Sequence, residues 1–264
     1  MQRATATITT ALEQYRFNDA VRLSYDFVWH DFCDWYVELA KGKLNHPETK
    51  AQTATLLRHV LEQSLRLLHP VMPFVTEELW QHVKPSNATE SIMTAAWPAP
   101  EKRYVDAKTE RAFILGQQIV AAIRNIRAEF RIPSIQQLQV HCTVPTDAML
   151  ALFRETADFM SRMSGSDFHL GRAKQRLKHA ATVLVGKVEV VVPLEDVIDL
   201  AKERERLEAQ LQQIAVQLRG LQGRLKNKEF LKKAPAEVIA KEKERATTLT
   251  QQQKALAQSI ATLR

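Results

Sequence analysis

Three side chains that could do chemistry together lie one helical turn apart near the N-terminus. His30, Cys33 and Asp34 fall within the string FVWHDFCDWYVELAK, residues 27–41. Spacings of three and four place them on one face of a helix, where an imidazole and a carboxylate can form an acid–base pair or ligate a metal ion. The sequence holds no second cluster of histidines and cysteines to complete such a site. We interpret the three as part of a charged, solvent-facing strip, and a hydrolase built on His30 and Asp34 stays an alternative.

The helix that carries these side chains is predicted over Asn18–Lys41. One apolar line with spacings of four and three consists of Val21, Tyr25, Val28, Phe32, Trp35 and Leu39, and a second line consists of Trp29, Cys33, Tyr36 and Ala40. A helix with so wide an apolar surface must be covered by neighbours on more than one side. We therefore expect it in the middle of a helical bundle, with Trp29, Trp35 and Tyr36 in the core.

The neighbouring helices of this bundle have clear boundary signals. Helices are predicted over Ala4–Tyr15, from Pro47 to a stop at Pro70, and from Pro73 onward, because proline fits the first turn of a helix and ends one from within. The first of them begins almost at residue one. We therefore interpret the start of the bundle as cut, and expect an uncovered apolar face through which the chain self-associates.

A further helix over Thr109–Arg131 combines an apolar and a basic line. The apolar line, Ile119, Ile123, Ile126 and Phe130, is the predicted core face; the basic line is Arg124, Arg127 and Arg131. A basic line of this kind can be a solvated helix face. The same spacing also suits contact with nucleic-acid phosphates, so we treat the three arginines as candidate nucleic-acid contacts of the bundle.

Residues 134–193 have a different pattern from the helices before them. Polar and apolar residues alternate at Leu138, Val140 and Cys142, as in a half-buried strand, and a helix is expected over Thr146–Ser164. Two short apolar runs flank Gly186 and predict a hairpin. Together they predict a small βαββ module.

Residues 194–264 carry two helical seams. The outgoing seam is Leu200, Arg204, Leu207, Leu211, Ile214, Leu218, Leu221 and Leu225, and the returning seam is Ala246, Leu249, Gln253, Leu256, Ile260 and Leu263. The pattern stops over residues 227–234, and Pro235 restarts a helix. Two such arms predict an antiparallel coiled-coil hairpin, each arm about 45 Å long at 1.5 Å per residue.

The tip of this hairpin, Leu218–Lys233, is strongly basic. Its only acidic residue is Glu229. Its bases are Arg219, Arg224, Lys226, Lys228, Lys232 and Lys233. Residues 1–106 hold 11 Lys/Arg against 13 Asp/Glu, so the net charge of +7 belongs to the later part of the chain. Such a field suits a polyanionic partner, and we take the tip as the second candidate binding site for one.

Composition limits the remaining classes. A chain of 264 residues with 45% hydrophobic residues can build a substantial core, and 7 glycines without a G-x-G-x-x-G or Walker pattern leave no phosphate-cradling loop. Cys33 and Cys142 predict neither a disulfide framework nor a zinc site. No leader and no long apolar run is present in the sequence, so we expect a cytoplasmic chain without a membrane partner.

Several of these strings resemble a known family. FVWHDFCDWYVELAK, LHPVMPFVTEELW (Leu68–Trp80) and SIMTAAWP (Ser91–Pro98) resemble the anticodon-binding helical bundle of class Ia aminoacyl-tRNA synthetases. IRNIRAEFRIP (Ile123–Pro133) and RLKNKEFLKKAPAEVIAKE (Arg224–Glu242) resemble the valyl-tRNA synthetases in particular. The resemblance spans essentially the whole chain, while the catalytic and editing domains of that family have no counterpart in it.

The resemblance implies a mainly α fold with three parts: an N-terminally truncated anticodon-binding bundle, residues 1–133; a small α/β module, 134–193; and a coiled-coil hairpin arm, 194–264. It implies tRNA(Val) as the partner, with no DNA, and a role in positioning that tRNA for aminoacylation. ATP and magnesium belong to the catalytic domain, so we expect no catalytic residue, metal or cofactor in this chain and no activity from it alone. A freestanding interaction protein built on the same bundle and coiled coil is the alternative.

Overall fold

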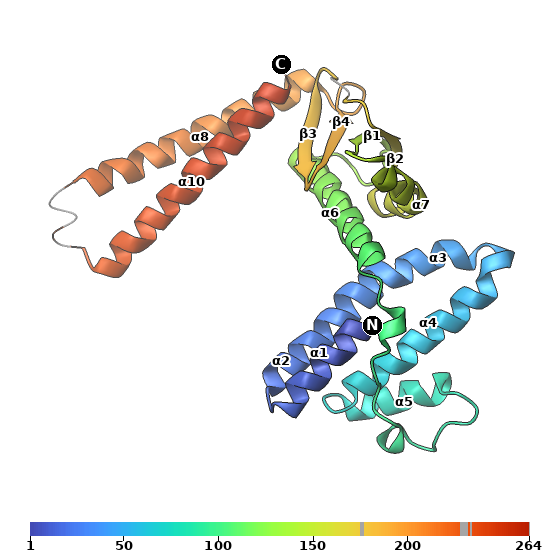
Figure 1. Ribbon diagram of the computed structural model, residues 1–264. Coiled ribbons are helices and arrows are strands. Elements are labelled where there is room, and N and C mark those ends of the chain that lie inside the picture. Colours follow the sequence, from blue (N-terminus) through green and yellow to red (C-terminus); the bar gives the residue numbers. More distant parts are fainter. Residues whose placement is uncertain (175–176, 228–231, 233, 264) are drawn as a thin grey trace. The chain divides into compact units, whose positions relative to one another are not determined.

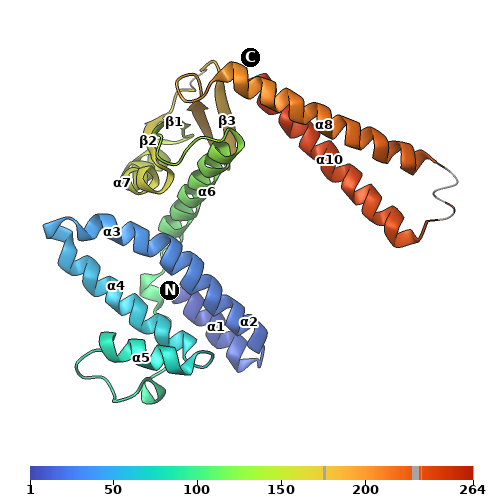
Figure 2. The same cartoon turned by 180° about the vertical axis from the view of Figure 1, so that it is seen from behind.

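The structure is a computed structural model that describes residues 1–174, 177–227, 232 and 234–263 (Figures 1 and 2). The chain forms two compact units, Met1–Glu110 and Arg111–Arg264. Helices dominate both, and the described residues contain a single four-stranded sheet, so the predicted mainly α fold is confirmed. Within these ranges, no helix has the length and apolar character needed to cross a membrane.

The first unit is a helical assembly. Its elements are α1 (Gln2–Glu13), α2 (Phe17–Tyr25), η1 (Asp26–Val37), α3 (Glu38–Leu44), α4 (Pro47–Leu68), α5 (Pro73–Val83), η2 (Ile92–Thr94) and η3 (Lys102–Tyr104). Helix α1 packs on α2, α3 on α4, and α4 on α5. Pro47 and Pro73 each open a helix as predicted. The backbone N–H groups of the first helical turn have no intrahelical acceptor, so proline, which lacks an N–H, fits there without losing a hydrogen bond. Leu65, Trp80 and Ile92 form one buried cluster.

The predicted helix over Asn18–Lys41 is continuous but not uniformly α-helical. Its middle half, η1, is a π-helix of 12 residues between α2 and α3. Hydrogen bonds from residue i to i+5 widen the helical turn, so side chains spaced by three and four no longer fall on one line. The apolar lines read from the sequence are therefore displaced along this segment.

The core assignment of this helix is wrong in part: two of its exposed apolar residues, Val21 and Tyr25, lie in α2, and a third, Trp29, lies in η1. Phe32 is buried as predicted, but Val21, Tyr25 and Trp29 are 42%, 53% and 55% exposed. Trp35 and Tyr36 are half-buried. The buried side of η1 is formed by Phe27 together with Phe32. Trp29 is thus a surface residue of this unit.

The second unit contains the sheet and the longest helices. Its elements are α6 (Ala107–Glu129, which starts at the end of the first unit), β1 (Leu138–Thr143), α7 (Asp147–Ser164), β2 (Ser166–Gly171), β3 (Ala180–Val185), β4 (Val188–Pro193), α8 (Leu200–Lys226) and α10 (Ala236–Thr262). The predicted core face of α6 is confirmed, since Ile119, Ile123, Ile126 and Phe130 are all buried.

The sheet has the strand order β2-β1-β4-β3. Strand β1 pairs in parallel with β2 and antiparallel with β4, and β3 pairs antiparallel with β4 around Gly186. The predicted hairpin is confirmed. The predicted βαββ order lacks β2, so the module is βαβββ. This edge strand was missed because its sequence, SDFHLG, is short and polar, and its pairing depends on β1 rather than on its own pattern.

Helices α8 and α10 lie side by side in both views and run in opposite directions (Figures 1 and 2). Leu218, Leu221 and Leu249 form a buried cluster between them, and Ile214 and Ala246 pack against it. The predicted pairing of two helical arms through these seams is confirmed. Supercoiling of the pair stays a prediction.

Candidate nucleic-acid interface

The basic tip lies where α8 ends and α10 begins. Arg219, Lys226 and Lys232 are exposed. Lys228 and Lys233 lie outside the described residues. Three long cationic side chains thus reach water at the end of a paired-helix arm, where the negative charge of a helix C-terminus favours positive residues such as Lys226.

Arg224 differs from its neighbours on the tip. Its Nη1 donates to Oε1 of Glu242 across the helix pair, at 3.2 Å. The side chain of Glu242 is only 17% exposed, whereas that of Arg224 is 56% exposed. A partly buried carboxylate is stabilised by a nearby guanidinium. Arg224 therefore joins α8 to α10 near the tip, and this reduces its freedom to contact a phosphate.

The three arginines predicted for the bundle side do not form one surface. Arg131 is exposed and lies just beyond α6 with a φ of 53°. Arg124 is exposed, and its Nη2 donates to the carbonyl of Met163 at 2.9 Å. Arg127 is 7% exposed. The basic line read from the sequence is therefore divided between surface and interior.

Arg127 is held by three backbone carbonyls. Its Nε donates to Ser164 at 3.0 Å, Nη1 to Pro133 at 3.0 Å and Nη2 to Gly165 at 2.6 Å. Burial lowers the pKa of this guanidinium, but arginine remains charged in proteins. With its donors engaged below the surface, Arg127 is not available to a tRNA phosphate, and that assignment is corrected.

The same contacts explain why the arginines lie at this spacing. Helix α7 ends at Ser164, and Gly165 follows in the left-handed conformation with a φ of 62°. The last carbonyls of a helix have no intrahelical partner and carry negative partial charge. Arg124 donates to the carbonyl of Met163, and Arg127 donates to those of Ser164 and Gly165, which also accept from Ser166 and Leu138. Two members of the basic line thus cap the C-terminus of α7.

The first candidate cluster, His30, Cys33 and Asp34, lies on the surface of η1. His30 Nδ1 and Asp34 Oδ2 are 3.2 Å apart, and both side chains are more than half exposed. The Cys33 thiol has its pKa raised by partial burial and then by Asp34, which disfavours the thiolate. Within the described ranges, no three His, Cys, Asp or Glu side chains gather as metal ligands would. The geometry is that of a solvated charged strip.

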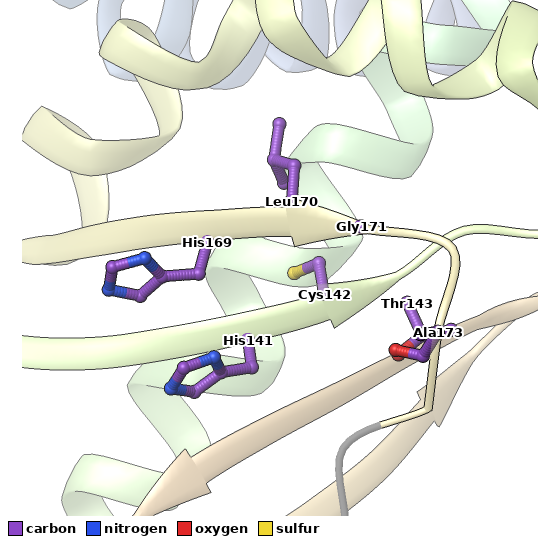
Figure 3. A pocket seen from close by; sticks show the side chains of 7 residues that line it. All are labelled: His141, Cys142, Thr143, His169, Leu170, Gly171 and Ala173. Carbon is purple, nitrogen blue, oxygen red and sulfur yellow. The ribbon is translucent and has the colours of Figure 1, made fainter.

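A small cavity lies between the parallel strands β1 and β2 (Figure 3). His141 and His169 are register partners, and their rings stack with centroids 4.8 Å apart. The cavity measures about 70 Å³, and its other boundaries include Cys142 and Gly171. Burial raises the pKa of Cys142 to about 12, so its thiol is protonated and unreactive. Parallel rings direct their nitrogen lone pairs alongside one another rather than toward a common point. This arrangement suits packing better than ligation.

Sequence reasoning missed the residues that join the arm to the rest of its unit. The backbone carbonyl of Glu129 accepts from Arg206 Nη2 at 3.0 Å, and its carboxylate accepts from the Ser259 hydroxyl. These partners are 77 and 130 residues away along the chain. No pattern within a single helix indicates such contacts.

Two family models match separate parts of the chain. Residues 1–142 match the family described as the anticodon-binding domain of tRNA ligase, and residues 199–264 match the family described as the valyl tRNA synthetase tRNA binding arm. The second match spans α8, α10 and the basic tip between them.

Curated relatives support the same grouping. The valine–tRNA ligase of Bacillus licheniformis is 35% identical over 261 residues, which cover 98% of this chain and 29% of that protein. The enzymes of Geobacter sulfurreducens and Thermotoga maritima are 36% and 37% identical, over 100% and 94% of this chain and 30% and 28% of their own lengths. The chain thus spans less than a third of these relatives. With more than half of its residues in the first family match, the chain belongs to the anticodon-binding domain family of tRNA ligases.

Proposed function

We propose that this chain binds tRNA as the anticodon-binding and arm region of a valine–tRNA ligase. In that role it holds tRNA(Val) while another part of the enzyme joins valine to it. The observation that carries the proposal is a basic tip on the α8–α10 pair, within the residues that match a tRNA-binding arm. ATP and magnesium act where the nucleotide-binding motifs are, and this sequence has none of them.

The tip supplies the arm's contacts. Arg219, Lys226 and Lys232 are exposed cations, and the sequence adds Lys228 and Lys233. Lysine and arginine at such a site bind phosphate oxygens, which orients a nucleic acid without reading its bases. The arm therefore adds binding energy and placement rather than identity.

The bundle side keeps Arg124 and Arg131 as its candidates. Both are exposed, and Arg131 stands at the end of α6, where the chain leaves the helix. We propose that functional parts follow residues 1–133, 134–193 and 194–264. We also propose a cytoplasmic location, because aminoacylated tRNA is used there.

Binding is tested by titrating the purified chain with tRNA(Val) and a second tRNA at several salt concentrations. We expect affinity that falls steeply with salt for both, because bound protein cations displace counterions from the phosphates. The chain alone is expected to form no aminoacyl-adenylate with valine, ATP and magnesium. A chain that binds neither tRNA at low salt contradicts the proposal.

Self-association is a second candidate property of the first unit. Val21, Tyr25 and Trp29 are spaced by four and are 42–55% exposed. An apolar line of this size on a surface tends to be covered in the assembled state. A freestanding interaction protein would use the same line. Capture of a protein partner by a chain that ignores tRNA would favour that alternative.

A further inference from the structure

Both helices of the arm donate a hydrogen bond to Glu129 of α6. This residue is the last of α6, so its carbonyl has no partner within the helix. Arg206 of α8 donates to that carbonyl from Nη2 at 3.0 Å. Ser259 of α10 donates from its hydroxyl to the carboxylate of the same residue. One residue thus contacts both arms of the hairpin, through its backbone and its side chain.

The guanidinium of Arg206 is itself fixed in place. Its Nε donates to Glu203 at 2.8 Å, its Nη2 also pairs with that carboxylate, and Nη1 donates to Gln210 at 3.1 Å. The side chains of Arg206 and Glu203 are 21% and 11% exposed. The pKa of Arg206 is raised mainly by Glu203, and the charge of Glu129 adds to this. A bidentate, partly buried ion pair has one preferred geometry, so it fixes the position from which Nη2 of Arg206 donates to Glu129.

The position on α10 is equally enclosed. Ser259 is 8% exposed, and the adjacent Ile260 and nearby Leu263 are 5% and 4% exposed. On α8, Leu207 is 1% exposed beside Arg206. The polar contacts therefore lie at the edge of buried apolar side chains at the base of the arm. There they add directional contacts to packing that by itself has little directionality.

We propose that Glu129 is a positioning residue that fixes the direction of the α8–α10 arm relative to α6 and its module. This rests on the proposed function, since a fixed direction is useful for presenting the tip to tRNA. An arm held in its binding direction loses less conformational freedom when tRNA binds, and affinity is higher for that reason. Glu129 is not a tRNA contact in this account.

The first test measures the arm without tRNA. Spin labels are placed at Gln222→Cys on α8 and Arg154→Cys on α7, both exposed positions of the same unit, with Cys33→Ser as background. Cys142 is buried and unreactive. We expect a narrow distance distribution for the parent, a broader one for Glu129→Ala and for Ser259→Ala, and a narrow one for Glu129→Gln. The glutamine oxygen still accepts from the serine hydroxyl, so this variant is the matched control. Equal widths for Glu129→Ala and the parent overturn the proposal.

The second test separates positioning from phosphate contact. Glu129→Ala should weaken tRNA binding by up to about tenfold, which is ~1.4 kcal/mol, with the slope of affinity against salt unchanged. Removal of a phosphate contact would instead reduce that slope. A broadened arm with parental affinity overturns the role in binding. If the parent binds no tRNA, the proposed function fails, while the distance measurement still decides whether Glu129 positions the arm. Urea unfolding curves are recorded for Glu129→Ala and Ser259→Ala, the two variants that lose the bond between Ser259 and Glu129. A cooperative transition in both shows that a broadened arm comes from loss of this bond and not from loss of the fold.

Discussion

The guanidinium of Arg127 donates to the carbonyl of Gly165 at 2.6 Å, across 38 residues of sequence. This bond and its companions join α6 to the end of α7, and Gly165 reaches the required position with a φ of 62°. A Cβ at Gly165 would lie 3.2 Å from Nη2 of the same arginine. An arginine that the sequence presents as one of three surface bases is thus a buried cap for a helix C-terminus.

Replacing Arg127 should destabilise the second unit rather than remove a tRNA contact. Arg127→Met removes the charged donor that joins the carbonyls of Pro133, Ser164 and Gly165, although each carbonyl keeps one other donor. Hydrogen bonds to a charged group contribute more to stability than neutral ones. We expect a loss of about 1–3 kcal/mol in the free energy of unfolding, measured by urea denaturation.

The matched control is Arg131→Met, whose side chain is exposed beyond α6. It should change stability by less than about 0.5 kcal/mol, as surface substitutions do. Equal urea midpoints for Arg127→Met and the parent would show that the buried guanidinium is dispensable.

His141 makes the stability of the sheet depend on pH. Burial and then the neighbouring His169 lower the pKa of His141. The unfolded chain therefore binds this proton more tightly, and stability is lost as pH falls below about 6.5, the ordinary histidine value. The loss continues until the pH passes below the lowered pKa of the folded state.

The measurement compares the free energy of unfolding at pH 7.5 and pH 5.5 for the parent and His141→Gln. The glutamine variant should lose less stability between the two values. Carboxylates on the same sheet face, Asp167 and Glu189, are present in both proteins, so their contribution cancels in the comparison. The control is His59→Gln, because His59 is an exposed residue of α4. A parent and a His141→Gln variant with the same pH dependence would refute this prediction.

Trp29 should promote self-association of the first unit. It stacks on Tyr25 with ring centroids 6.1 Å apart, and both rings are more than half exposed. Trp29→Glu places a charge in the apolar line, and burying that charge between two chains is unfavourable. Sedimentation velocity at increasing protein concentration should show oligomers for the parent and fewer for the variant. A parent that remains monomeric at the highest concentration contradicts this expectation.

Local signals explain which parts of the fold could be predicted. Pro47, Pro73 and Gly186 specify a backbone geometry at their own positions, so α4, α5 and the β3–β4 hairpin follow from sequence. The seams of α8 and α10 are equally visible, because each helix needs one apolar side against the other.

Other features depend on contacts made far away in the sequence. The π-helical middle of the second helical segment keeps the composition of an α-helix but shifts its faces, and this exposes Trp29. Arg127 and Arg131 look alike in spacing and charge, yet only the position of α7 decides that one is buried. The role of Glu129 requires three helices at once. Site residues were therefore harder to predict than the fold.

Recognition of tRNA by the basic tip is best tested through the salt dependence of binding with and without the tip's charges. The variant carries Arg219→Gln, Lys226→Gln and Lys232→Gln and keeps Arg224, because Arg224 pairs with Glu242. The control carries Arg219→Lys, Lys226→Arg and Lys232→Arg, so the positive charge at each position is retained. Binding of tRNA(Val) and a second tRNA is measured at several salt concentrations.

We predict that the glutamine variant binds both tRNAs more weakly, by a similar factor, because phosphates carry no sequence information. Its plot of log affinity against log salt should be flatter, by at most about 0.9 for each phosphate that the tip no longer neutralises. The charge-retaining control should match the parent. Equal affinity and an equal slope for the glutamine variant and the parent would contradict tRNA binding by the tip. The charges of the tip would then serve only to keep this turn soluble.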